Sequence, residues 1–250
     1  MLEGMDGASM TLPPRVGTCG YSYFWNEGKP SPFEWYLGQG FNTVEVNASF
    51  YRFPSPSWTR VWLRAPGDFD FSIKVHRSIT HYRRLGEGCP ELFERFRRPL
   101  EPLRERIAFW LFQMPPTFTY KERNAAKLAS FLSALGLASS AVLEFRHPSW
   151  WEHVGEVMET EAAFCSVDAP GLPRDLIAVN DVLYLRIHGR TSWYSHVYSE
   201  EELEGIASGV VRSDADRKYV YLNNDEGMLS NGSFLMRRFG LKVGVQRTID

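Results

Sequence analysis

The chain contains eight short apolar segments, and each of them ends in polar or charged side chains. Strands that are buried on both faces require near-continuous apolar sequences of this kind. Their spacing, about 30 residues on average, leaves room for a strand and a crossover helix in each unit. In chain order the segments cover residues 16–19, 43–47, 69–74, 108–113, 141–146, 164–168, 183–188 and 219–223.

Most of these segments are followed by apolar residues at helical spacing, as in residues 124–135, where Gly136 suits a helix end. The connection after the sixth segment, residues 169–181, is too short for a full crossover helix and contains two prolines. We therefore predict an α/β fold, a TIM-barrel-like (β/α)8 parallel barrel with an irregular sixth unit.

The chain of 250 residues is long enough for one barrel, and no repeat or low-complexity linker divides it. Residues 1–14 contain no apolar core of a signal peptide, so we expect a mobile N-terminal leader. We expect residues 15–250 to form a single TIM-barrel-like domain.

Composition narrows the function classes only slightly. A net charge of −2 gives no overall reason to expect a nucleic-acid or membrane partner. Three scattered cysteines are too few for a disulfide framework or a CxxC metal site. No segment approaches the ~20 apolar residues of a transmembrane helix. We expect a cytoplasmic protein that does not bind membranes, and we leave its oligomeric state open.

Charged side chains end several of the predicted strands, and parallel strands would bring them to one rim of the barrel. Burying charges is costly unless they are paired or in use, so this rim is the predicted working face. We expect Glu45 and Asp168 to act as general bases, His188 as a proton shuttle and Glu144 as a further catalytic acid group. The expected substrate-binding residues are Lys74, Gln113, Arg146, Arg186, Asn223, Tyr51 and Tyr21. The alternative is a purely structural salt-bridge network at the barrel mouth.

The same acids and His188 are also a mixture of ligands that a divalent ion accepts. However, Lys74, Arg146 and Arg186 would share the same volume, neutralise the acids and repel an incoming cation. We therefore name no metal ligand and predict no cofactor, while a divalent metal stays open.

The most basic stretch of the chain, residues 74–84, contains no acid. Guanidinium groups suit phosphate or carboxylate recognition, although a solvated surface is the plain alternative. Tyr21 and Tyr51 belong to aromatic clusters that follow the first two strands, and such rings stack on bases or sugars. These features favour a phosphorylated, sugar-like or nucleotide-like ligand.

Several motifs carry a resemblance to a known family. Residues 42–51 (NTVEVNASFY), 111–116 (LFQMPP), 144–150 (EFRHPSW) and 185–190 (LRIHGR) resemble the proteins called domain of unknown function 72, or YecE-like. The matching segments run in order from Val16 to about Phe239. The resemblance implies a TIM-barrel-like fold and no established biochemical activity.

Three functions remain after this reading. We favour an enzyme, a hydrolase or lyase of unknown substrate, that uses acid–base chemistry on a small anionic substrate in the barrel mouth. The second is a nucleic-acid binding or processing protein, whose binding would be weak and electrostatic because only residues 74–84 offer a basic surface. The third is a non-catalytic anion-binding protein.

Overall fold

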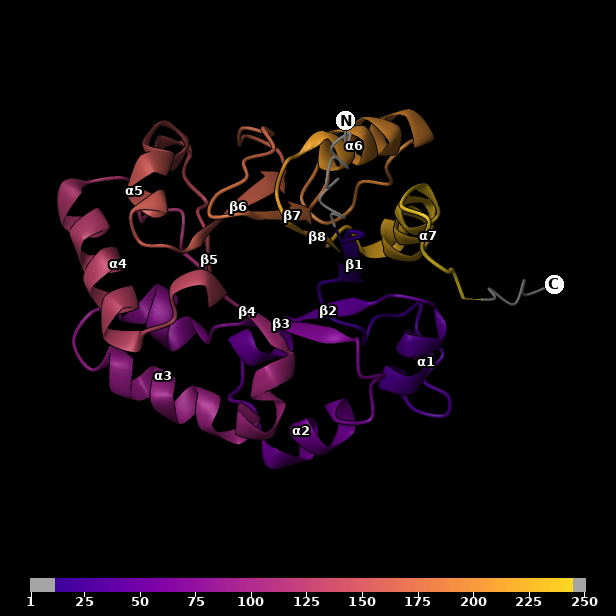
Figure 1. The fold of residues 1–250 in the computed structure, drawn as a ribbon, viewed down its shortest axis with the longest axis horizontal. Coiled ribbons are helices and arrows are strands. Elements are labelled where there is room, and N and C mark those ends of the chain that lie inside the picture. The colour runs from indigo at the N-terminus through magenta and orange to yellow at the C-terminus, as the bar shows by residue number, and fades with distance from the viewer. Residues whose placement is uncertain (1–11, 245–250) are drawn as a thin grey trace, which may run out of the picture.

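The computed structural model describes residues 12–244, so most of the leader expected at residues 1–14 lies outside the described range. A ring of strands lies at the centre of the molecule, with helices around it (Figure 1). Every apolar segment of the sequence overlaps one strand. The strands are β1 (Arg15–Thr18), β2 (Thr43–Val46), β3 (Asp70–Lys74), β4 (Ile107–Gln113), β5 (Ala141–Glu144), β6 (Ala163–Asp168), β7 (Val182–Ile187) and β8 (Arg217–Leu222).

The strands form a single parallel sheet in the order β1-β8-β7-β6-β5-β4-β3-β2. Between β1 and β2 the ladder is reduced to one parallel bridge, Cys19 to Glu45. There the Tyr36 hydroxyl accepts a hydrogen bond from the Thr18 N–H (3.0 Å) and donates one to the Thr43 carbonyl (2.8 Å). The barrel is therefore nearly closed. Between β1 and β2, the hydroxyl of the buried Tyr36 bridges the two backbones by hydrogen bonds.

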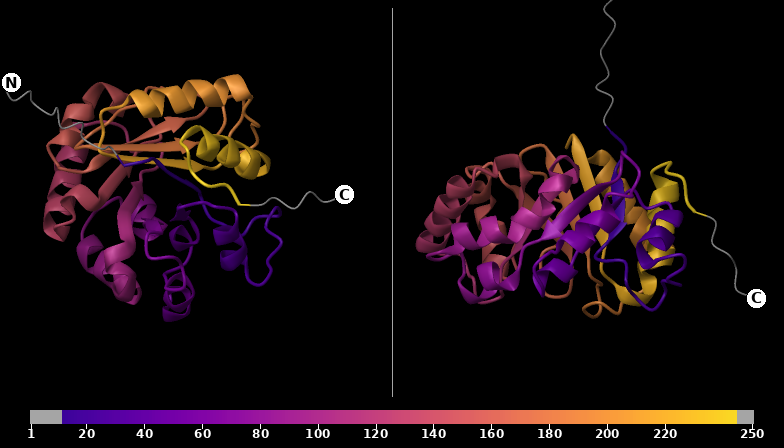
Figure 2. Two further views of the ribbon diagram at one scale, coloured as in Figure 1. Left: turned by 45° about the vertical axis from the view of Figure 1, so that its right-hand side comes forward. Right: turned by 90° about the horizontal axis from the view of Figure 1, so that it is seen from below.

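Helices cover the outside of the strands, as two further views show (Figure 2). No helix of the described part of the chain is long and apolar enough to cross a membrane. The α-helices are α1 (Pro32–Gly38), α2 (Pro56–Trp62), α3 (Cys89–Arg97), α4 (Glu122–Leu135), α5 (Val154–Met158), α6 (Glu200–Arg212) and α7 (Met228–Arg238).

The sixth unit is irregular, as predicted: no helix is found between β6 and β7 in the described structure.

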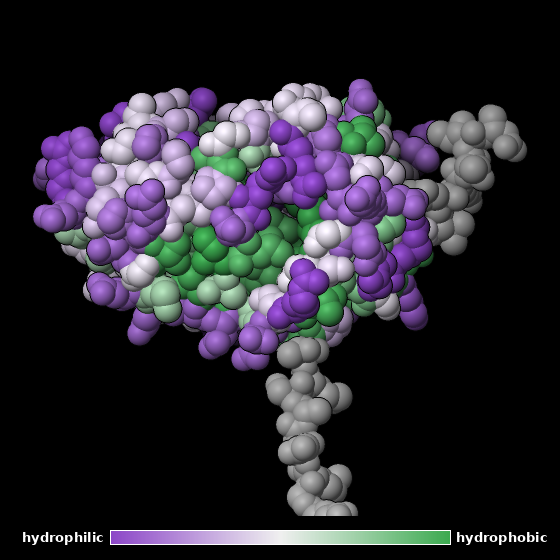
Figure 3. Space-filling view, turned by 90° about the horizontal axis from the view of Figure 1, so that it is seen from above, coloured by the Kyte–Doolittle hydropathy of each residue, from purple (hydrophilic) through white to green (hydrophobic). Residues whose placement is uncertain are grey.

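In the seventh unit, α6 begins with a capping box formed by Ser199 and Glu202. Seen from above the view of Figure 1, the side on which α6 lies has apolar residues at its middle and hydrophilic residues around them (Figure 3). The barrel fold is confirmed, including the unit that lacks a helix.

Side chains of each strand alternate between the barrel interior and the helices. In β7, Leu183, Leu185 and Ile187 pack in the outer core, whereas Tyr184 belongs to the inner one. The interior is layered. Below the mouth, the Tyr221 hydroxyl lies 2.8 Å from the hydroxyls of both Thr43 and Ser72. Charged groups from β2, β3, β5 and β7 lie above this layer, at the carboxyl ends of the strands.

Candidate functional site

A buried ion-pair network lies at the mouth of the barrel. The Arg186 side chain is fully buried and donates to Glu45 Oε1 (2.7 Å) and to Glu144 Oε2 (2.5 Å). Arg146 Nε lies 2.6 Å from the other Glu144 oxygen, and the Tyr184 hydroxyl donates to Glu45 Oε2 at 2.8 Å. Both terminal nitrogens of Arg186 are thus committed to carboxylates. We assign this residue, expected to bind substrate, to holding Glu45 and Glu144 in place.

The charges of the network fix the protonation state of Glu144. Burial alone raises the pKa of Glu144, but the charges of Arg146 and Arg186 hold it well below its usual range. Glu144 is therefore a carboxylate at neutral pH. Its two oxygens face different arginines, so it positions cations and is poorly suited to take up a proton.

His188 adjoins this network and is held by two neighbours. An Arg146 nitrogen lies 3.2 Å from His188 Nε2, and the side-chain nitrogen of Asn223 lies 3.1 Å from Nδ1. Burial and the charges of Arg146 and Arg186 set the pKa of His188 well below its ordinary value. With its pKa lowered in this way, the His188 ring is neutral at neutral pH. The structure thus places His188 and Asn223 together, as expected of neighbouring strand ends.

Lys74 differs from the other cations of the mouth. Its side chain is 8% exposed, and its ammonium lies 4.5 Å from the centre of the Phe50 ring. Within residues 12–244, it forms no ion pair with a carboxylate. Burial and the charge of Arg186 lower the pKa of Lys74 to about 8, although Glu144 and Glu45 oppose that shift. An amine of this kind exists in both protonation states near neutral pH.

The edge of the mouth contains aromatic rings and one more histidine. His81 packs edge-on against Phe50, with ring centres 4.9 Å apart, and Arg146 lies 4.5 Å over the Trp193 ring. Burial and the charge of Lys74 lower the pKa of His81 to about 4, so this ring is neutral as well. Tyr51, an expected ligand residue, is 65% exposed at the outer rim.

Asp168 does not join the network, although β6 ends at the same rim. Its neighbours Cys165 and Val167 belong to the interior core, so strand alternation turns Asp168 to the opposite face. There it pairs with Arg190 (3.0 Å) and accepts from the Tyr198 hydroxyl (3.0 Å). The expected role of Asp168 as a general base in the mouth has no support in this geometry.

The remaining expected residues lie on the other strands of the rim. Gln113 ends β4 on the same face as Leu111, which belongs to the interior core, and is half-buried. Tyr21 lies beyond β1, where its hydroxyl accepts a hydrogen bond from Trp62 Nε1 at 2.9 Å. Tyr21 therefore lines a separate cavity at the β1–β2 side of the mouth.

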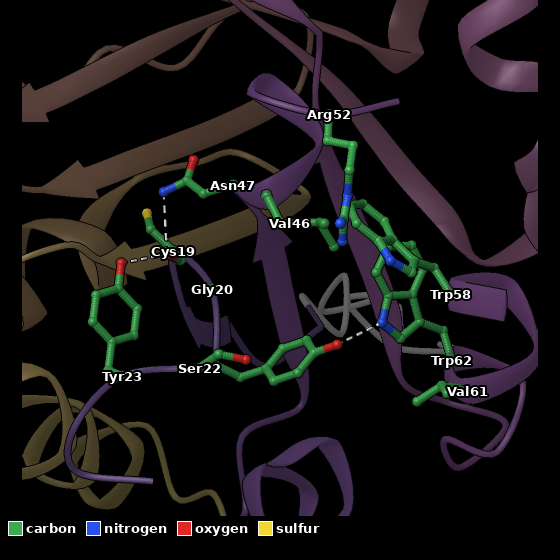
Figure 4. A pocket seen from close by; sticks show the side chains of 12 residues that line it. Cys19, Gly20, Ser22, Tyr23, Val46, Asn47, Arg52, Trp58, Val61 and Trp62 are labelled. Carbon is green, nitrogen blue, oxygen red and sulfur yellow. Dashed lines mark hydrogen bonds between the residues drawn. The ribbon is translucent and has the colours of Figure 1, made fainter. Parts of the chain in front are cut away.

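This cavity has a volume of about 350 Å³. Figure 4 shows the Trp58 and Trp62 rings on one side and Tyr23 on the other, with Asn47 and Cys19 between them. The Oδ1 atom of Asn47 is buried and has no hydrogen-bond partner among the residues that the structure describes. Cys19 also contacts Arg186 of the ion-pair network, with 3.4 Å between sulfur and nitrogen. The cavity and the charged mouth are therefore direct neighbours.

The described residues contain no cluster of three or more His, Cys, Asp or Glu side chains that could hold a metal ion. Arg186 lies between Glu45 and Glu144, and Arg146 pairs with Glu144 alone of these two acids. The three cysteines are free thiols, all buried.

Sequence reasoning gave no site role to Tyr184, and it counted Phe50, His81 and Trp193 only as members of aromatic clusters or of the basic stretch. A signal for Tyr184 was present. It is two residues before Arg186, which is two before His188, so period-two alternation places all three on one face. Phe50 and His81 lie in short helical turns, residues 48–50 and 78–82, and Trp193 lies in the connection after β7, so the strand period of two does not apply to them.

Comparison with known proteins identifies the family. The model of the family described as "Protein of unknown function DUF72" matches residues 15–246. The chain belongs to the DUF72 family. It is 29% identical over 223 residues to UPF0759 protein YunF of Bacillus subtilis, covering 75% of this chain and 78% of YunF. It is 33% identical over 112 residues to UPF0759 protein YecE of Escherichia coli K12, covering 44% and 40% of the two chains.

Solved structures of DUF72 members have the same fold. The protein TM1631 of Thermotoga maritima matches with a TM-score of 0.79 at 29% identity, over 91% of this chain and 98% of that one. The protein EF0366 of Enterococcus faecalis matches with a TM-score of 0.79 at 20% identity, over 94% and 99%. The expected family is thus confirmed, and the family description assigns no activity.

Proposed function

We propose that this DUF72 protein is an enzyme that binds a small anionic substrate in the barrel mouth and acts on it by acid–base chemistry. The observation that carries the proposal is an uneven charge balance. Glu45 and Glu144 are neutralised by Arg186 and Arg146, whereas Lys74 has no acid partner in the described structure. One positive charge is left over in a largely desolvated mouth, where it attracts an anion more strongly than it would in water.

Lys74 is also the group best suited to exchange a proton with the substrate. A general acid or base works best when its pKa lies near the operating pH. The pKa of Lys74, about 8, meets this condition, whereas Glu144 stays ionised and His188 stays neutral. We therefore move the central chemical role from the expected acids to Lys74. The ion pairs around Arg186 hold the mouth rigid beneath it.

The neighbouring cavity gives room for the part of the substrate that does not react. Ligand sites of proteins are concave, mostly apolar and start at about 300 Å³, with a few polar groups that fix orientation. The indole rings of Trp58 and Trp62 supply the apolar wall, and the free Asn47 oxygen accepts one hydrogen bond. These features support a sugar-like or nucleotide-like substrate that carries an anionic group.

A non-catalytic anion-binding protein is the second candidate. It is favoured by the observation that both buried carboxylates are already ion-paired, which is also what a purely structural ring requires. The two proposals share the anion site and differ only in whether Lys74 reacts.

Thermal unfolding in increasing inorganic phosphate tests the anion site. A ligand that binds only the folded state stabilises it by about 2.7 kcal/mol at 100 times its Kd. We expect this stabilisation in the wild type, and its loss in Lys74→Met. Lys218→Met is the matched control, because Lys218 is nearly as buried (7% exposed) but lies near the start of β8. A wild type whose unfolding temperature ignores phosphate and sulfate would overturn the proposal.

A further inference from the structure

We propose that Lys74 is a nucleophile that forms an iminium bond with the carbonyl carbon of a small anionic aldehyde or ketone. The proposal rests on the anion site described above and names the substrate class of that site. A phosphorylated sugar in its open-chain form belongs to this class, since it combines a carbonyl group with an anion.

The geometry around Lys74 is that of a reactive amine. The residue ends β3 with its side chain at the barrel mouth, where Ser72 precedes it on the interior face. Its ammonium packs on the face of Phe50, and no carboxylate of the described chain ties it down. Arg186 and Arg146 are the cations whose charges act on it. Lysines become nucleophilic when they are desolvated or placed near other cations, and Lys74 is buried, packs on an aromatic ring and feels the charges of Arg186 and Arg146.

The lowered basicity increases the share of neutral amine, which is the form that attacks a carbonyl. With a pKa of about 8, about a tenth of Lys74 is neutral at pH 7. A lysine at the ordinary pKa of about 10.4 is neutral only about once in 2,500 molecules, so the neutral fraction is roughly two hundred times larger here.

The step is balanced without any oxidant or metal. The Nζ lone pair attacks the carbonyl carbon, the C=O electron pair moves to oxygen, and the oxygen takes up a proton to give a carbinolamine. Loss of water then leaves the iminium cation, so that one lysine ammonium and one carbonyl compound yield one protonated imine and one molecule of water. The positive charge is retained within reach of the charges of Glu45 and Glu144. Both hydrogens of the released water come from the Lys74 nitrogen, whose ammonium carries three and whose iminium keeps one.

Reductive trapping on the full-length protein tests this assignment. Glycolaldehyde phosphate serves as the anionic aldehyde at pH 7, and cyanoborohydride reduces the iminium to a stable secondary amine that peptide mass spectrometry locates. We expect Lys74 to be modified at least ten times faster than Lys218 or any other lysine. Inorganic phosphate should slow that modification. Labelling of Lys74 at no more than the rate of the other lysines would overturn the inference.

A second aldehyde separates this inference from the anion site on which it rests. Unphosphorylated glycolaldehyde has the same reactive group without the charge. If phosphate stabilises the protein but Lys74 is not trapped, the claim that Lys74 is a nucleophile is overturned, while the claim that the mouth binds an anion is supported. Equal trapping of both aldehydes, without stabilisation by phosphate, would overturn the anionic substrate class. Lys74→Arg should keep the stabilisation and lose the dominant modification, whereas Lys218→Arg should change neither.

Discussion

Replacing Arg186 by Met tests whether the buried ion pairs hold the barrel mouth together. Arg186 is fully buried and contacts Glu45 and Glu144 at the same time. Without it, Glu45 has no cation paired with it among residues 12–244, while Glu144 still has Arg146. Removing one partner of a buried pair leaves an uncompensated charge in the interior and costs about 3–5 kcal/mol. We therefore expect a strong loss of stability from this single change.

The loss should be visible as a shift of the thermal midpoint. In a chain of this size each kcal/mol moves the midpoint by about 2–4 °C, so Arg186→Met should unfold roughly 6–20 °C below the wild type. Circular dichroism at neutral pH measures this directly. Arg104→Met is the matched control, because Arg104 pairs with Glu101 and Glu105 at the exposed surface, and we expect a change within about 0.5 kcal/mol.

A double variant locates the source of the loss. Adding Glu45→Gln to Arg186→Met removes the uncompensated carboxylate, so part of the stability should return. If Arg186→Met unfolds within about 2 °C of the wild type, the reasoning from buried charge is refuted.

Three further predictions follow from the same geometry. Because the folded-state pKa of His188 lies below the unfolded value, the unfolded chain binds more protons below about pH 6.5. The free energy of unfolding should then fall by about 1.4 kcal/mol per pH unit on acidification, a slope that His188→Gln should reduce in urea titrations. Tyr36→Phe should cost about 1–3 kcal/mol, measured by urea unfolding, because Thr18 and Thr43 lose their shared partner between β1 and β2. Asp168→Asn should leave stabilisation by phosphate unchanged; a loss of that effect would place Asp168 in the mouth after all.

The sequence by itself determined the barrel. Strands buried on both faces must be apolar over nearly their whole length, so all eight were visible as short runs, and the helix-free stretch between the sixth and seventh was visible from its length and prolines. The sequence also determines which side chains of each strand face the barrel interior. Alternation within β6 places Asp168 opposite Val167, away from the interior, and alternation within β7 places Tyr184 and Arg186 inside.

Only the tertiary structure decided which charges neutralise one another. Arg186 reaches Glu45 on β2 and Glu144 on β5, strands that its own strand does not adjoin in the sheet, and this contact exists only because the barrel curves round on itself. Once both acids are taken up in this way, Lys74 remains without an acid partner in the described chain. A pattern along the chain records which face a side chain occupies, because that depends on its neighbours in sequence. Which acid pairs with which cation depends on how the closed barrel brings distant strands together, and residues close in sequence carry no information on that.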